Sequence, residues 1–168
     1  MKVVADSSPL IALAKIRQFD LLQRLFGSVI IPAEVYAEVV VVGAGLAGAS
    51  ETGSATWIEV RHLKDRSALA AAHERFALDL GELSVLVLAK EIGADLLLLD
   101  DLAARRLARV GGFRVQGTVG IVEASFTRGY LKDLRGAFGE LLTRGVFLDP
   151  AFLNARLNLL NLPPLSDS

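Results

Sequence analysis

The chain contains no cysteine, only two histidines and no long apolar run. Without cysteine it forms neither a disulfide nor a thiolate metal site, which fits a cytoplasmic protein. His62 and His73 lie eleven residues apart and have no cysteine partner, so they do not match a zinc site. No apolar run approaches the ~18 residues of a membrane span. The first apolar run ends at Asp6, too early for the core of a signal peptide. We therefore expect a cytoplasmic protein with no membrane association.

An excess of charge of one sign is also absent. The 18 Lys and Arg residues nearly balance the 19 Asp and Glu residues, so the net charge is −1. A nucleic-acid partner would therefore need a local basic patch. With 168 residues, 52% hydrophobic and 22% charged, the composition predicts one globular domain. We expect residues 1–150 to form its body and residues 151–168 to add a C-terminal helix and tail.

Short apolar runs alternate with helical patterns along most of the chain. Such runs predict strands near residues 2–5, 28–31, 57–60, 95–101 and 113–118. Helical spacing of apolar residues predicts helices near residues 10–14, 19–26, 32–42, 68–78, 79–93 and 102–112, and through the C-terminal third. This alternation indicates an α/β fold of three layers, in which a central parallel sheet of about five strands has helices on both faces.

The stretch Val39–Ser50, "VVVVGAGLAGAS", has the G-x-G-x-x-G spacing of a dinucleotide-binding turn. That turn joins a strand to a helix of about a dozen residues. Here the valines continue a helical stripe that starts at Val35, and only "ASETGSAT" follows before the next predicted strand. We therefore favour a flexible loop. Residues 43–53 would be an insertion rather than a mobile lid, and a flavin or nicotinamide site is the alternative.

Acidic residues close two of the predicted strands. Asp6 ends "KVVAD", and Asp100 and Asp101 end "ADLLLLDD". Ligands of open parallel sheets bind at the carboxyl ends of the strands. If these two strands are neighbours, the carboxylates share one rim of the sheet. The alternative is that Asp6 and Asp101 only cap the helices that follow them.

Two glutamates are further candidates. Glu82 lies three residues after Asp79 in "DLGE", which has the form of a capping box, so a purely structural role is the alternative. Glu38 lies one turn after Glu34 on a predicted helix, and a solvated helix face is its alternative. If the acids converge, they raise one another's pKa unless a cation neutralises them. Oxygen ligands select Mg²⁺ or Mn²⁺, ions that support phosphodiester cleavage.

Five blocks of the sequence together resemble PIN-domain proteins, in particular their VapC-like bacterial and archaeal branch. They extend from about Lys2 to Phe147 and read "VVADSSPLI", "VIIPAEVYAEV", "DLGELSVLVLA", "LLLLDDLAARRLA" and "VQGTVGIVEAS". The resemblance implies a PIN-like three-layer fold. It also implies Mg²⁺- or Mn²⁺-dependent cleavage of single-stranded RNA, often by the toxin of a toxin–antitoxin pair. A catalytically silent PIN-fold binding module is the competing hypothesis.

The resemblance also assigns roles to single residues. It implies a catalytic set and a metal-binding set that share most members, with Asp100 and Asp101 interchangeable as the ligand after the fourth strand. The catalytic set is Asp6, Glu38, Glu82 and Asp101, and the metal-binding set is Asp6, Glu82, Asp100 and Asp101. Ser7 and Thr118 match hydroxyl positions. Glu82 departs from the aspartate that is more common at its position.

Three arginines follow the acids at 100–101 on one predicted helix. Arg105 and Arg109 share a face of that helix and are candidates to contact RNA phosphates, with a solvated helix face as the alternative. The apolar segments "PLIALAKI" and "FDLLQRLF" exceed what a small core needs. In the resemblance this region forms a homodimer and binds a cognate antitoxin, and a role in the core alone is the alternative. The sequence does not indicate the RNA target or whether DNA is cut.

Overall fold

Five parallel strands form one sheet in the computed structural model, which describes residues 1–166. Their order across the sheet is β3-β2-β1-β4-β5, so the first strand lies in the middle. The strands are β1 (Val3–Ala5), β2 (Val29–Pro32), β3 (Ile58–Arg61), β4 (Leu96–Leu98) and β5 (Arg114–Gln116). The predicted α/β class and the parallel sheet are confirmed.

Helices connect the strands and make up the C-terminal third. Up to β4 they are α1 (Ser7–Lys15), α2 (Leu21–Phe26), α3 (Ala33–Tyr36), the π-helix η1 (Ala37–Val42), α4 (Ala49–Ser54), α5 (Arg66–Arg75) and α6 (Leu80–Ile92). After β4 they are α7 (Leu102–Val110), α8 (Thr118–Thr127), α9 (Leu134–Thr143) and α10 (Pro150–Leu159). Helix α5 begins two residues before the predicted segment because Asp65 caps it, accepting a hydrogen bond from the Ala68 N–H at 3.0 Å.

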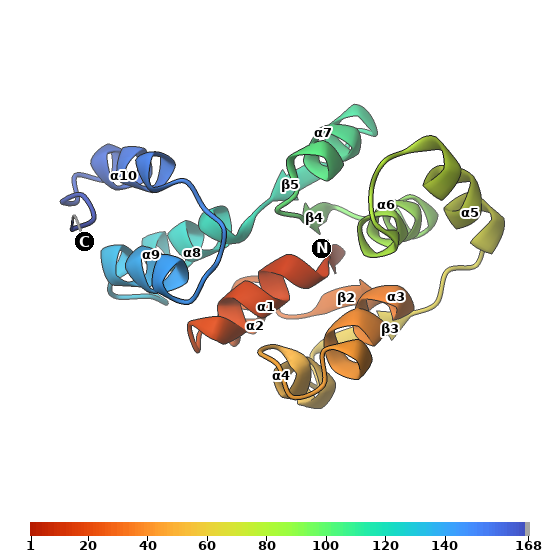
Figure 1. Ribbon diagram of the computed structural model, residues 1–168, viewed down its shortest axis with the longest axis horizontal. Helices are drawn as coiled ribbons and strands as arrows, with labels where there is room; N and C mark the ends of the chain where they lie inside the picture. The colour runs from red at the N-terminus through yellow and green to blue at the C-terminus, as the bar shows by residue number, and fades with distance from the viewer. Residues whose placement is uncertain (167–168) are drawn as a thin grey trace.

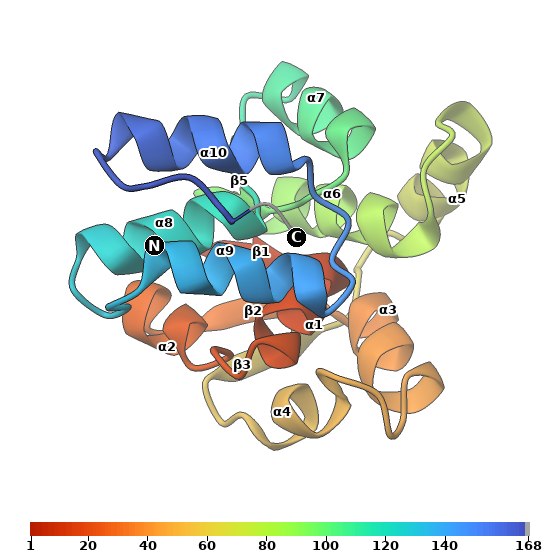
Figure 2. The ribbon, with the colours of Figure 1, turned by 60° about the vertical axis from the view of Figure 1, so that its left-hand side comes forward.

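The helices cover both faces of the sheet. Helices α1, α2 and α8 pack together, while α6 packs on β1 and β2 and contacts α7 (Figure 1). Helix α9 packs on α8, and α10 lies beside α9 (Figure 2). Helix α3 and the π-helix contact α6 and α1 respectively, so this segment stands at the rim of the sheet. No helix within residues 1–166 has the length and apolar character that a membrane span needs.

The central strands are buried, and their register aligns their carboxyl ends. Every residue of β1, β2 and β4 is buried, as expected for a parallel sheet covered on both faces. Ala5 pairs with Leu98, and Leu98 pairs with Gln116. The residues that follow these three therefore emerge at one edge of the sheet, where the predicted acids lie.

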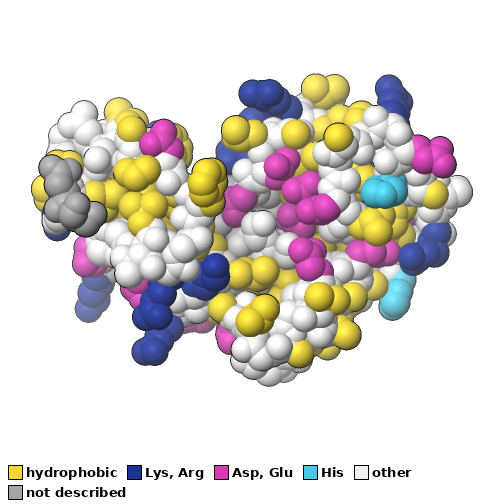
Figure 3. Space-filling model, viewed as in Figure 1, with side chains coloured by type: hydrophobic (Ala, Val, Ile, Leu, Met, Phe, Trp, Pro, Cys, Tyr) yellow, Lys and Arg dark blue, Asp and Glu magenta, His cyan; other side chains and the backbone are white. Residues whose placement is uncertain are grey.

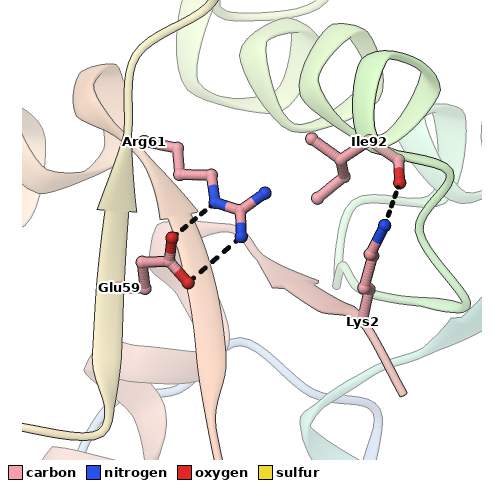
Figure 4. Close-up of polar contacts among 4 residues, drawn as sticks. All are labelled: Lys2, Glu59, Arg61 and Ile92. Atoms are coloured by element: carbon pink, nitrogen blue, oxygen red, sulfur yellow. Dashed lines mark hydrogen bonds and ion pairs between the residues drawn. The ribbon is translucent and has the colours of Figure 1, made fainter.

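Polar contacts lie along the edge strand β3 and at the start of β1 (Figure 4). On the outer strand β3, the Arg61 guanidinium donates to both carboxylate oxygens of Glu59, at 2.6 and 3.2 Å. Charged side chains on an edge strand disfavour pairing with another chain. Lys2 Nζ donates to the carbonyl of Ile92 at 2.8 Å, which satisfies one of the free carbonyls at the end of α6.

The glycine-rich stretch is not a dinucleotide-binding turn. Its valines form η1, in which the Gly43 N–H donates to the Glu38 carbonyl five residues back at 2.9 Å. No strand precedes the glycines, so the flavin or nicotinamide alternative lacks its structural basis. The expected flexible loop is also wrong in part, because residues 49–54 form α4. This short helix packs on η1 and α1, with Thr52 buried.

Candidate active site

Asp6 occupies the position directly after the central strand, and one oxygen of its carboxylate has no hydrogen-bond partner. Its backbone N–H donates to the Leu98 carbonyl at 3.0 Å, which continues the pairing of β1 with β4. The residue stands at the N-cap of α1, yet its side chain makes no capping hydrogen bond. Asp6 is only 3% exposed, and its buried Oδ1 has no hydrogen-bond partner. The capping alternative therefore does not describe this side chain.

The space beside Gly81 is where other acids come close to Asp6. A Cβ at Gly81 would lie 2.8 Å from Oε2 of Glu38, 3.3 Å from Oδ1 of Asp79 and 3.4 Å from Oδ1 of Asp6. Carboxylates from three segments therefore lie beside the first turn of α6: Asp6 after β1, Glu38 on η1 and Asp79 at the start of α6 itself. Figure 3 shows acidic side chains grouped in the middle of this face, between α3 and α6.

Helix α6 carries Glu82 into this group through its first turn. Asp79 and Glu82 form the predicted capping box, in which the Glu82 N–H donates to Asp79 Oδ1 at 2.8 Å and the Asp79 N–H donates to Glu82 Oε2 at 3.1 Å. The capping role is real, but it does not exclude a second role, because Glu82 also lines the groove beside Asp100 and Asp101.

The two acids after β4 are held in different ways. Asp100 accepts hydrogen bonds from the backbone N–H and the hydroxyl of Thr118, at 2.7 and 2.6 Å. The register explains this contact, since Asp100 and Thr118 each lie two residues after the paired strand ends Leu98 and Gln116. Asp101 caps α7 by accepting from the Ala104 N–H at 2.8 Å. Thr118 therefore orients Asp100, while Asp101 is exposed.

Burial, and to a smaller extent the proximity of the other acids, raises the pKa values of Asp6, Glu38 and Glu82. The pKa of Asp6 is raised to about 7, mainly by burial and in part by the charges of Asp79, Glu38 and Glu82, while the Ser7 N–H opposes the shift. Burial raises the pKa of Glu82 to about 6, with Asp79, Asp101 and Glu38 as charged neighbours. For Glu38, desolvation and Asp79 raise the pKa, while Ser7 opposes the shift.

No basic side chain neutralises these acids. Within residues 1–166, no Lys, Arg or His forms an ion pair with Asp6, Glu38, Glu82, Asp100 or Asp101. Arg105 lies close to Asp100, because Arg105 Nη1 and Asp100 Oδ1 are each 2.8 Å from the position that a Cβ at Gly117 would occupy. Its Nε is buried without a hydrogen-bond partner. Arg109 is exposed and lines the same groove one turn further along α7.

The donor set has the chemistry that a hard divalent cation requires. All its members offer oxygen, and Asp6 Oδ1 is buried and unpartnered. The residues described do not form a closed site, however, because no three Asp, Glu, His or Cys side chains among them are close enough to hold an ion together. Asp6, Glu38 and Asp79 approach one position beside Gly81, whereas Asp100 and Asp101 lie with Glu82 along the groove.

The sequence indicated all of these acids as candidate site residues except Asp79, which it indicated only as a helix cap. Its carboxylate is the charged neighbour common to Asp6, Glu38 and Glu82. The capping box fully accounted for Asp79 locally, so the sequence carried no further signal. Glu34, considered beside Glu38, lies outside this group and pairs with Arg66 at 3.4 Å.

Comparison with known families gives the same fold. A family model described as a PIN domain matches residues 2–162, nearly the whole chain. The chain therefore belongs to the PIN-domain family, whose members are generally nucleases that use divalent metal ions. No match was found among curated proteins.

Proposed function

We propose that this protein is a Mg²⁺- or Mn²⁺-dependent endoribonuclease of single-stranded RNA, and the toxin of a toxin–antitoxin pair of the VapC-like branch. The observation that carries the nuclease proposal is Asp6. Its Oδ1 is buried without a hydrogen-bond partner and lies near other acids, and within residues 1–166 no basic side chain forms an ion pair with it. A bound cation removes the cost of that arrangement.

Asp6, Glu82, Asp100 and Asp101 are the proposed metal-binding residues. Asp79 joins them because of its position beside Gly81. When bound, a divalent ion supplies charge neutralisation at the reacting phosphate and lowers the pKa of water. The raised pKa of Glu82, about 6, means that protons compete for the site in mildly acidic solution.

The other polar residues position the substrate and move protons. Glu38 projects from η1 with a raised pKa and an exposed side chain, so it is the proposed base that takes the proton from the attacking water. Thr118 holds the Asp100 carboxylate by two hydrogen bonds. Ser7 lies beside Asp6 and Glu38. Arg105 is proposed to contact the phosphate through its guanidinium, whose Nε is buried without a hydrogen-bond partner.

Cleavage of a labelled pool of single-stranded RNA with Mn²⁺ tests this proposal. We expect cutting by the wild type, none in EDTA, and a loss on the order of a hundredfold or more in Asp6→Asn. Asp20→Asn is the matched control, because Asp20 is exposed and makes no side-chain capping bond. If the folded, Mn²⁺-loaded wild type cuts no RNA in the pool, the silent binding module replaces the nuclease.

The proposed homodimer and the cognate antitoxin follow from the VapC-like resemblance. The structure buries most apolar side chains of α1 and α2 inside the chain, leaving Ile11, Leu25 and Phe26 partly exposed. We expect light scattering to give twice the chain mass of 17.9 kDa. A concentration-independent monomer would contradict the dimer and leave the nuclease proposal intact.

A further inference from the structure

A long groove leads away from the acids. It has a volume of about 1380 Å³, and Glu82, Asp100 and Asp101 lie along it. Helices α1, α7 and α8 contribute to its walls, and the far side is formed by residues 145–149 with the start of α10. Figure 3 shows a hollow between the left-hand lobe and the rest of the molecule, with hydrophobic side chains facing acidic ones across it.

Two phenylalanines line the far side of this groove. Phe147 is 103% exposed and Phe152 is 50% exposed. A single exposed apolar residue is ordinary on a protein surface. Two aromatic rings on the wall of one groove offer flat surfaces that the packing of the chain leaves open, wholly at Phe147 and by half at Phe152.

The backbone around both rings is firmly anchored. The Val146 N–H donates to the Leu141 carbonyl at 2.9 Å, and Val146 and Leu148 pack on the core on either side of Phe147. Asp149 caps α10 by accepting from the Ala151 N–H at 2.9 Å. Leu153, next to Phe152, is fully buried. A ligand that contacts the rings therefore pays little to order the chain.

Unpaired cations accompany the rings. Lys15, Arg109 and Arg128 line the groove, and in residues 1–166 none of them forms an ion pair or a side-chain hydrogen bond. Arg156, by contrast, is committed to Glu123 through two hydrogen bonds that tie α10 to α8. Exposed aromatic rings combined with free cations are the features that bind single-stranded nucleic acid.

We propose that Phe147 and Phe152 form a base-stacking platform for a single-stranded nucleic acid that lies in this groove. Lys15, Arg109 and Arg128 contact its phosphates, and the strand leads to the acids. Two parts of this proposal rest on the proposed function: that the strand is RNA, and that its cleaved phosphate lies at the acids. Stacking uses the face of a base rather than its hydrogen-bonding edge, so the platform tolerates any sequence.

Fluorescence anisotropy in EDTA at low salt tests the platform without cleavage. The probes are a labelled oligoadenylate RNA, its DNA counterpart, and the same RNA with abasic sites at successive central positions. We expect the wild type to bind the abasic strand at least tenfold more weakly than the intact one. The double variant Phe147→Ala/Phe152→Ala should bind the intact RNA at least tenfold more weakly than the wild type does. It should also bind the intact and abasic strands equally.

Two further variants separate stacking from general effects. Phe147→Trp keeps a flat ring and should retain the discrimination. Leu159→Ala removes an apolar side chain that is 66% exposed on the same helix but lies outside the groove, and it should bind as the wild type does.

Several outcomes overturn the platform: no binding of intact RNA or DNA by the wild type, an unchanged affinity in the double variant, or an equal abasic penalty in both proteins. A double variant that binds RNA normally but changes its mass in light scattering would assign the surface to a protein contact. Cleavage is assayed separately with Mn²⁺. If the wild type distinguishes intact from abasic RNA but does not cut RNA, the nuclease proposal alone is wrong. If the wild type cuts RNA and the double variant binds RNA normally, the platform alone is wrong.

Discussion

At the scale of single residues, Asp6 shows that a side chain can stand at a helix start without capping it. The Asp79 and Asp101 carboxylates both accept capping hydrogen bonds, whereas Asp6 leaves a buried oxygen unsatisfied. An unpartnered buried polar atom costs free energy, typically about 1–3 kcal/mol. Such a cost marks a residue that serves the site rather than the fold.

Gly81 gives the sharpest prediction at this scale. Alanine at this position would place a Cβ 2.8 Å from the end of the Glu38 side chain. The Glu38 side chain is flexible, so it moves aside at little cost to the fold, and alanine favours a helix over glycine by up to about 1 kcal/mol. We expect Gly81→Ala to lower Mn²⁺-dependent RNA cleavage at least tenfold while the melting temperature stays equal or rises.

The control for that experiment is Gly139→Ala on α9, where a Cβ meets nothing within 4 Å. It should keep wild-type cleavage. Full activity in Gly81→Ala would show that Glu38 does not need its present position, and a large fall in melting temperature would show that Gly81 serves the fold instead.

At the scale of elements, the sequence predicted more of the sheet than of the segment between β2 and β3. Continuous apolar runs such as 96–99 and helical stripes are local signals, and the strands lie where those runs predict them. The π-helical register of residues 37–42 depends on hydrogen bonds that no periodicity distinguishes from an α-helix. Helix α4 was missed because its residues, "ASETGS", have weak helical propensity, and its stability comes from packing on α1 and η1.

Helix α7 supplies a prediction about phosphate contacts. Arg109 lines the groove and has no ion-pair partner within residues 1–166, whereas Arg106 is exposed on the same helix outside the groove. Losing one phosphate contact to a single strand should lower the slope of log affinity against log salt by about 0.7. We expect this change in Arg109→Ala, measured by anisotropy in EDTA between low and moderate salt.

Arg106→Ala is the matched control, since it removes the same charge from the same helix. Its salt slope should equal that of the wild type. Equal slopes in all three proteins would remove Arg109 from the substrate path, and equal decreases in both variants would indicate a general effect of net charge.

At the scale of the whole molecule, the site depends on an arrangement that no single motif contains. Asp6 and Asp100 are far apart in the chain and share one edge only because β1 and β4 are neighbours with Ala5 opposite Leu98. Sequence reasoning made the shared edge conditional on that neighbourhood. It listed Glu38 as a candidate on a helix face, and the family resemblance supplied a role for Glu38 and named Thr118. Asp79 was not predicted as a site residue, because its role depends on three segments that meet at Gly81, which is a tertiary property.

The raised pKa values make stability depend on pH in a defined direction. Asp6 has a pKa of about 7 in the folded chain and an ordinary value of 3.8, so between these values the folded chain binds a proton that the unfolded chain has released. The resulting stability is complete below pH 4 and is lost as the pH rises through 7. Glu82, with a pKa of about 6 against 4.5, acts in the same direction.

Metal-free wild type should therefore become less stable from pH 4 to pH 8, by about 4 kcal/mol through Asp6 alone, and Asp6→Asn should show a flatter profile.

Mn²⁺ must displace the Asp6 proton at pH 6 but not at pH 8, so it should raise the melting temperature more at pH 8. At a hundredfold excess over its dissociation constant, the gain is about 2.7 kcal/mol, or roughly 5–10 °C for a chain of this size. Differential scanning fluorimetry of both proteins, with Asp20→Asn as control, measures this. An equal Mn²⁺ shift at both pH values, or one that Asp6→Asn retains, would place the bound ion away from Asp6.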